Sequence, residues 1–117
     1  MTAYRYDGTF AGFLTCAWDA LESGIQPAAF LLPDDEGLLW AEQELAADPQ
    51  RAKRLYAALA KRVSPPFQKL IARGFLTCLP EKELALLNLI RRGLWEGDRV
   101  RLDLSDPVMA KENLALT

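Results

Sequence analysis

The stretch that decides the fold is YRYDGTFAGFLTCAWDA, residues 4–20. Its first three residues alternate around aromatic side chains, which is typical of a short strand, and Asp7-Gly8 then predicts a turn. Apolar residues recur at helical spacing over residues 10–23, between a capping Thr9 and a terminating Gly24. A strand followed at once by an amphipathic helix predicts a fold that contains both kinds of structure.

Start and stop signals for further helices recur along the chain. Acidic or hydroxyl residues followed by proline predict a second helix over 48–63 and a third over 64–78. A fourth is predicted over 80–97, and its many leucines place it centrally in the core, with Gly93 as a weak point. The pair Asp-Pro recurs at residue 106 and predicts a fifth helix.

Two apolar runs before the second helix indicate strands. AAFLLP at 28–33 and GLLWAEQEL at 37–45 are separated by a turn at 33–37, although Ala, Glu and Gln in the second run favour helix. We expect a small antiparallel sheet from the N-terminal third. The sequence thus predicts a single domain over residues 1–117 of the α+β class, predominantly helical, with four to five helices packed together with that sheet.

The composition excludes several kinds of chemistry. The 117 residues are half hydrophobic and include two cysteines and no histidine, so catalysis or metal binding through imidazole needs a partner. We expect no catalytic site, no metal and no cofactor; an enzyme would have to use carboxylates such as Asp7 or Asp19. No apolar stretch approaches the length of a membrane span and no signal peptide is present, so we expect a cytoplasmic protein without membrane contact.

Charge is distributed unevenly along the chain. Residues 1–50 hold one basic and nine acidic side chains, whereas residues 51–101 hold twelve basic and four acidic ones. Basic helix faces can follow a phosphate backbone, or they can pair with acidic protein surfaces. The candidate nucleic-acid contacts are Lys53, Arg54, Lys61, Arg62, Lys69, Arg73, Arg91, Arg92, Arg99 and Arg101.

Other features are weaker signals. GFLTC occurs at 12–16 and again at 74–78, but helical spacing puts the two copies on different faces, so we interpret them as parts of two unrelated helices. Gly74 is expected to let another helix approach closely. Trp40 and Trp95 are candidate stacking platforms for bases.

In order, these landmarks resemble a family. YRYDGTFAGFLTCAWDA, above all Tyr6-Asp7-Gly8-Thr9, is similar to the opening of the bacterial probable DNA-metabolism proteins, a family of unknown function. DPQRAKRLYAALAKRVS and LIARGFLTCLPEKELALLNLIRRGLWEG are similar to its later helices. The resemblance implies association with a radical SAM protein of DNA repair or modification; some members carry a uracil-DNA-glycosylase-like domain after the shared region. Members continue into a basic segment beyond the point that corresponds to Thr117, so a truncated or short form is expected here.

Two functional hypotheses follow. The first is a non-catalytic accessory module of DNA metabolism that docks nucleic acid, a radical SAM partner, or both. The second is a protein–protein interaction module that does not bind nucleic acid, with a homo-oligomer as one of its forms.

Overall fold

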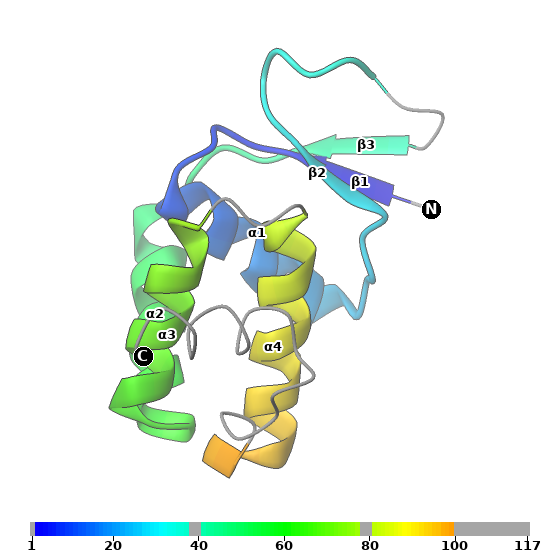
Figure 1. The fold of residues 1–117 in the computed structure, drawn as a ribbon. Helices are drawn as coiled ribbons and strands as arrows, with labels where there is room; N and C mark the ends of the chain where they lie inside the picture. The colour runs from blue at the N-terminus through cyan, green and yellow to red at the C-terminus, as the bar shows by residue number, and fades with distance from the viewer. Residues whose placement is uncertain (1, 38–40, 78–80, 100–117) are drawn as a thin grey trace. The chain divides into compact units, whose positions relative to one another are not determined.

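The computed structural model describes residues 2–37, 41–77 and 81–99, and the chain divides into two compact units, Met1–Tyr56 and Ala57–Thr117. The elements, in order, are β1 (Thr2–Arg5), α1 (Phe10–Ser23), β2 (Ala29–Leu31), β3 (Ala41–Glu44), α2 (Pro49–Arg62), α3 (Pro65–Phe75) and α4 (Lys82–Glu96) (Figure 1). The predominantly helical α+β class is confirmed. The helix expected from residue 106 lies outside the described residues, and the single-domain organisation stays a prediction.

The three strands form one parallel sheet in the order β2-β1-β3, so the expected antiparallel sheet was wrong. The central strand β1 pairs Tyr4 with Phe30 on one side and with Gln43 on the other. The segment 33–37 does not fold β3 back onto β2, because the chain crosses β1 before β3 begins. A helix and a crossing connection, rather than hairpins, join the strands, and such connections make neighbouring strands parallel.

α1 covers one face of this sheet (Figure 1). The Phe13 ring of α1 lies 5.7 Å from the Phe30 ring of β2, and Phe30 lies 5.6 Å from the Tyr4 ring, measured between centroids. The Tyr4 hydroxyl donates a hydrogen bond of 2.7 Å to Asp19 Oδ2 on α1. Since Tyr4 and Phe13 are completely buried, these aromatic contacts form the core of the first unit.

Both ends of α1 follow the expected local signals. Thr9 Oγ1 accepts a hydrogen bond of 3.0 Å from the Gly12 N–H, and Gly24 ends the helix with φ of 74° while its N–H binds Ala20 O. A hydroxyl at the start satisfies a backbone donor that has no helical partner, and glycine adopts the left-handed conformation at no steric cost. The predicted bounds of 10–23 are therefore confirmed.

The start of α2 is fixed to α1. The buried Thr15 hydroxyl donates to Ala11 O over 2.8 Å and accepts from the Asp48 N–H over 2.9 Å. Asp48 in turn caps α2 with Oδ1, which accepts from the N–H groups of Gln50 and Arg51. The predicted helix start at Asp48-Pro49 is thus confirmed.

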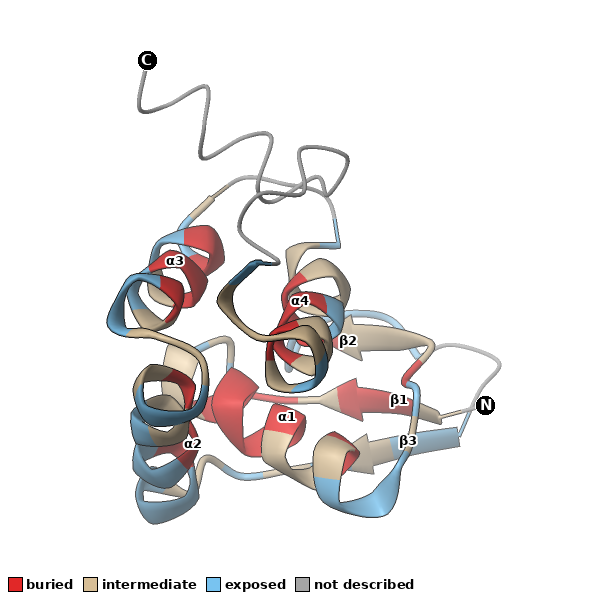
Figure 2. Cartoon of the chain, turned by 90° about the horizontal axis from the view of Figure 1, so that it is seen from below, coloured by how far each residue is buried: buried red, intermediate tan, exposed pale blue. Residues whose placement is uncertain are grey.

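In the second unit, α3 and α4 lie side by side and run in opposite directions (Figures 1 and 2). Ser64 caps α3 by accepting from the Phe67 N–H over 3.1 Å, and its hydroxyl also donates to Asp98 Oδ1 beyond the end of α4. Leu86, Leu87, Leu89 and Ile90 are completely buried. The prediction of α4 as a core helix is confirmed.

Gly93 of α4 lies directly against a buried side chain of α3. A Cβ atom added there would lie 2.5 Å from Cζ of Phe67, a ring that is completely buried. The weak point predicted inside α4 is therefore a required point of contact. Gly74, which was expected to have this role, is buried.

Among the described residues, no helix combines the length and the apolar character needed to cross a membrane.

Candidate functional site

The predicted basic residues of α2 are all exposed. Ala52, Leu55 and Leu59 of this helix are buried, so its basic residues lie on the remaining surface, where Figure 2 shows exposed residues (Lys53, Arg54, Lys61, Arg62). This is the amphipathic pattern expected of a helix with one solvent face. Lys61 and Arg62 also lie in the last turn, where positive charge is favourable for the helix dipole.

Two further cations are placed together by α3. Lys69 and Arg73 are exposed and four residues apart, which puts them on one face of the helix. Phe67, Leu70 and Ile71 occupy the buried face. Among the described residues, neither Lys61, Arg62 nor Lys69 takes part in an ion pair.

The remaining predicted cations divide into three cases. Arg91 and Arg92 on α4 are half-buried, and Arg92 Nε lies 2.9 Å from Glu96 Oε2, so this guanidinium already has a counter-charge. Arg99 is exposed. Its neighbour Asp98 accepts a hydrogen bond from the hydroxyl of Ser64, the residue that caps the start of α3. Arg99 therefore lies near the start of α3, and Arg62 precedes Ser64 by two positions in the chain. Arg101 lies outside the described residues.

The charge asymmetry of the sequence follows the two units. Residues 1–56 carry four basic and nine acidic side chains, whereas the described part of the second unit, residues 57–77 and 81–99, carries eight basic and four acidic ones. An acidic chain therefore contains a unit with a net positive charge. Only this second unit has the electrostatic character expected of a nucleic-acid interface.

In the described part of the second unit, two large apolar side chains are exposed. Trp95 on α4 is 91 % exposed, and Leu76, just after α3, is 82 % exposed. Trp95 remains available for stacking on a base or for contact with a protein. Trp40, the other candidate stacking platform, lies outside the described residues.

The family-like motif at residues 6–9 forms a helix cap. Asp7 Oδ1 accepts two hydrogen bonds from Thr9, 2.9 Å from its N–H and 2.7 Å from its hydroxyl, and Gly8 has φ of 85°. The Thr9 hydroxyl and backbone together hold the pKa of Asp7 below its ordinary value. A further residue, Gly12, belongs to this arrangement, because a Cβ there would clash with Asp7 Oδ1.

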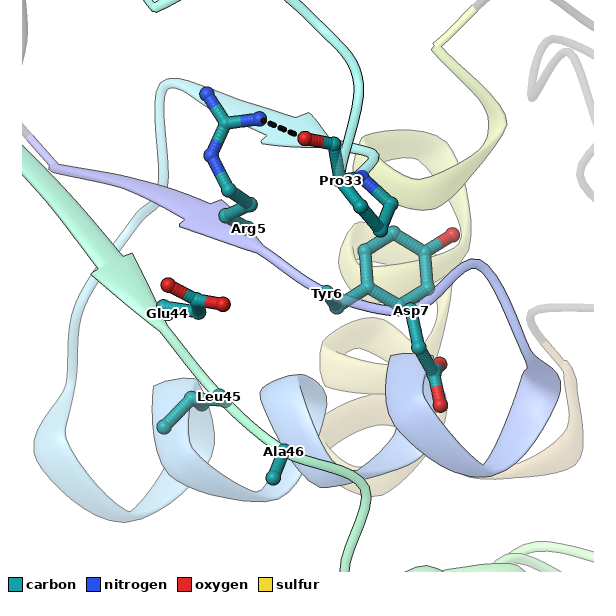
Figure 3. Close-up of a pocket in the computed structure, with 7 residues that line it drawn as sticks. All are labelled: Arg5, Tyr6, Asp7, Pro33, Glu44, Leu45 and Ala46. Atoms are coloured by element: carbon teal, nitrogen blue, oxygen red, sulfur yellow. Dashed lines mark hydrogen bonds between the residues drawn. The ribbon is translucent and has the colours of Figure 1, made fainter.

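Beside this motif, the first unit has a pocket of about 410 Å³ at the carboxyl edge of the sheet. Its lining residues lie at or just after the carboxyl ends of the three strands, because parallel strands end at the same edge of a sheet. They are Arg5, Tyr6, Asp7, Pro33, Glu44, Leu45 and Ala46. Figure 3 shows the Asp7 carboxylate directed toward the start of α1 and the Glu44 carboxylate on the side of Arg5. The two acidic groups therefore do not form a catalytic pair.

Arg5 fixes the connection that crosses the sheet. Its Nη1 donates to the carbonyl oxygens of Leu32, Pro33 and Asp35 at 2.7, 3.3 and 2.9 Å (the Pro33 bond is drawn in Figure 3). Its Nε lies 2.6 Å from Glu42 Oε1, and this hydrogen bond raises the pKa of the guanidinium further above its ordinary value. Arg5 thus ties the segment after β2 to the edge strand β3.

Sequence reasoning missed Arg5 and Glu44 as parts of a site. One signal was present, because Arg5 is the sole basic residue among the first fifty and stands between two tyrosines of a strand. Glu44 carried no such signal. It lies beside Arg5 only through the parallel register of β1 and β3.

The groups weighed for catalysis have structural roles. Burial raises the pKa of the Cys16 thiol to about 12, so this cysteine behaves as a small apolar residue. Asp19 accepts from Tyr4, whose pKa is raised above its ordinary value first by burial and then by this bond. Cys78 lies outside the described residues.

Comparisons of this chain with protein-family models, with curated proteins and with solved structures found no match.

Proposed function

We propose that this chain is a non-catalytic docking module of DNA metabolism that binds nucleic acid through the basic surface of its second unit. The observation that carries the proposal is a set of exposed cations on α2, on α3 and after α4 within an otherwise acidic protein. Its members in the second unit are Lys61, Arg62, Lys69, Arg73 and Arg99. Phosphate contacts of this kind supply affinity without base specificity.

The resemblance of residues 4–20 to the probable DNA-metabolism proteins adds a second partner to this proposal. A radical SAM protein of DNA repair or modification would be held by the same module while the basic unit holds the nucleic acid. The first unit carries nine acidic side chains and four basic ones, so its charge is opposite to that of the second unit. It offers such a protein a negatively charged surface separate from the one that would hold nucleic acid.

Fluorescence anisotropy with a labelled single strand and a labelled duplex tests nucleic-acid binding. We expect binding at about 50 mM salt that weakens steeply as salt rises, since each neutralised phosphate adds about −0.9 to the slope of log affinity against log salt. Lys61→Gln/Arg62→Gln and Lys69→Gln/Arg73→Gln should each make the duplex slope shallower by about 1.8.

The matched control is Arg51→Gln/Lys82→Gln, which removes the same charge from two cations outside the proposed surface. Arg51 Nε lies 3.5 Å from Asp48 Oδ2, and Lys82 Nζ lies 4.4 Å from the centroid of the Phe75 ring. This variant should keep the salt slope of the unmodified protein. Absence of binding at about 50 mM salt, or an equal loss in the control, contradicts the proposal.

The exposed Leu76 and Trp95 favour protein–protein docking as the alternative function. Light scattering distinguishes the two. If the chain associates with itself through these side chains, Leu76→Ser/Trp95→Ser should convert it to a monomer and leave any salt-dependent DNA affinity unchanged. A monomeric parent protein that also fails to retain the radical SAM partner contradicts this alternative.

A further inference from the structure

The pocket of the first unit lies where α/β sheets commonly bind small molecules. Its lining follows the carboxyl ends of all three parallel strands, with Tyr6 and Asp7 after β1, Pro33 after β2, and Leu45 and Ala46 after β3. In the strand order β2-β1-β3, the chain places β2 on one side of β1 and then crosses the sheet to place β3 on the other side. Ligand crevices form outside the carboxyl ends at such a reversal. Its volume of about 410 Å³ lies within the usual range for a small-molecule site.

The position that would receive a phosphate is already occupied. In dinucleotide-binding folds the first strand leads through glycines to an open helix N-terminus, whose N–H groups hold the anion. Here the Asp7 carboxylate takes that place, because its Oδ1 accepts from the N–H and the hydroxyl of Thr9. Gly12 provides room for this carboxylate, and its own N–H is bound to Thr9 Oγ1. An anionic ligand therefore meets a negative charge, and the N–H groups of Thr9 and Gly12 are already bound within the protein.

The arginine in the wall does not reverse this preference. The Arg5 guanidinium is bound through Nε to the Glu42 carboxylate and through Nη1 to three backbone carbonyl groups, so its charge is compensated within the protein. Two acidic side chains then determine the sign of the pocket. Asp7 and Glu44 both line it, and both are exposed residues on this edge of the sheet.

We propose that this pocket binds a small organic cation, a protonated amine with an apolar body. The carboxylates of Asp7 and Glu44 attract the ammonium group, and Pro33 and Leu45 supply apolar surface for the rest of the ligand. Glu44 is the carboxylate placed to contact the ammonium group, whereas the Asp7 carboxylate is directed toward the start of α1 and adds negative potential at the edge of the pocket (Figure 3). This site belongs to the first unit alone and is independent of the basic surface proposed for nucleic acid.

A titration followed by ¹H–¹⁵N correlation spectra of the full chain tests the site with three probes of similar shape. These are 2-phenylethylammonium, the neutral 2-phenylethanol and the anionic 3-phenylpropionate. We expect 2-phenylethylammonium to shift the backbone amides of Tyr6, Asp7, Leu45 and Ala46 with a Kd of about 1 mM. The other two probes should bind at least about fivefold more weakly, because one half-exposed ion pair changes the affinity by about that factor.

Variants assign the charge preference to the pocket. Glu44→Gln should weaken binding of 2-phenylethylammonium about fivefold, and Asp7→Asn should do the same while keeping an oxygen that caps α1. Glu36→Gln is the matched control, since it removes the same charge from an exposed residue that is not among those lining the pocket. The variants' own spectra report whether each is folded.

Three results would overturn the proposal. The first is equal binding of the ammonium, alcohol and carboxylate probes. The second is a set of amide shifts away from the carboxyl edge of the sheet, or no shift at about 10 mM probe. The third is a loss in Glu36→Gln as large as that in Glu44→Gln, which would show only a general effect of protein charge.

Discussion

Gly93→Ala should destabilise the protein, although alanine is the better helix former. Gly93 lies inside α4, where replacing glycine by alanine gains about 1 kcal/mol of intrinsic helix propensity. The new Cβ would lie 2.5 Å from Cζ and 2.9 Å from both Cε atoms of Phe67. Carbon atoms in good contact are about 3.5–4.0 Å apart, so either the ring or the helix must move by about 1 Å.

The magnitude follows from the surroundings of the ring. Phe67 is completely buried, and its backbone N–H is bound to the Ser64 cap, so neither end of the residue is free to shift. Overpacking of a filled core costs about 1–3 kcal/mol, and contact with three ring atoms points to the upper end. Subtracting the gain in propensity leaves a net loss of about 2 kcal/mol in the free energy of unfolding.

Urea unfolding followed by circular dichroism at the helix band measures this loss, and thermal unfolding should show a fall in Tm of roughly 8 °C. The paired control is Phe67→Leu/Gly93→Ala compared with Phe67→Leu alone. Leucine lacks the ring atoms that approach Gly93, so in this background the alanine should be neutral or stabilising by up to about 1 kcal/mol.

A neutral or stabilising Gly93→Ala in the parent protein would refute the reasoning. It would show that the Phe67 ring does not lie against Gly93, or that it moves aside at little cost. The same loss in both backgrounds would place the cause elsewhere than in this contact, because a direct clash requires coupling between the two substitutions.

Two further predictions concern the first unit. Arg5→Gln should speed hydrogen exchange at the Leu32 amide, which is bound to Asp35 Oδ2, because the guanidinium that holds the carbonyls of this segment is lost; unchanged exchange there would contradict its role. Asp7 has a pKa below its ordinary value of 3.8, so its stabilisation is complete above that pH and is lost as pH falls through the lowered value. Parent and Asp7→Asn urea midpoints should therefore converge on acidification, and a constant difference would contradict the capping role.

Local signals predicted the helices well because helix ends depend on neighbours in sequence. Thr9 and Gly24 fixed α1, and Ser64 fixed the start of α3, each through a hydrogen bond that spans at most four residues. The predicted end of α3 was less accurate, since the helix ends at Phe75. β1 begins before the predicted residues 4–6, and β2 is shorter than the predicted run at 28–33. Helix-favouring residues at 41–44 form β3 because pairing with β1 outweighs their propensity.

The candidate sites differ in how much of them the sequence could predict. The candidate cations of α2 and α3 are exposed, because amphipathic spacing separates them from the buried face. The pairing of Arg92 with Glu96 was not predicted, since it depends on the conformations that the two side chains adopt. The pocket at the sheet edge was not predicted at all, because its lining comes from three strands whose order the sequence did not show.

The sequence by itself determined the helices, their caps and the opposite charges of the two parts of the chain. These properties depend on residues within a few positions of one another or on composition. Only the tertiary structure decided that β1 lies between β2 and β3 in a parallel sheet, that Arg5 joins the segment after β2 to Glu42, and that Gly93 faces Phe67. Each of these contacts joins residues more than twenty positions apart, and local patterns carry no information about which distant partners will meet.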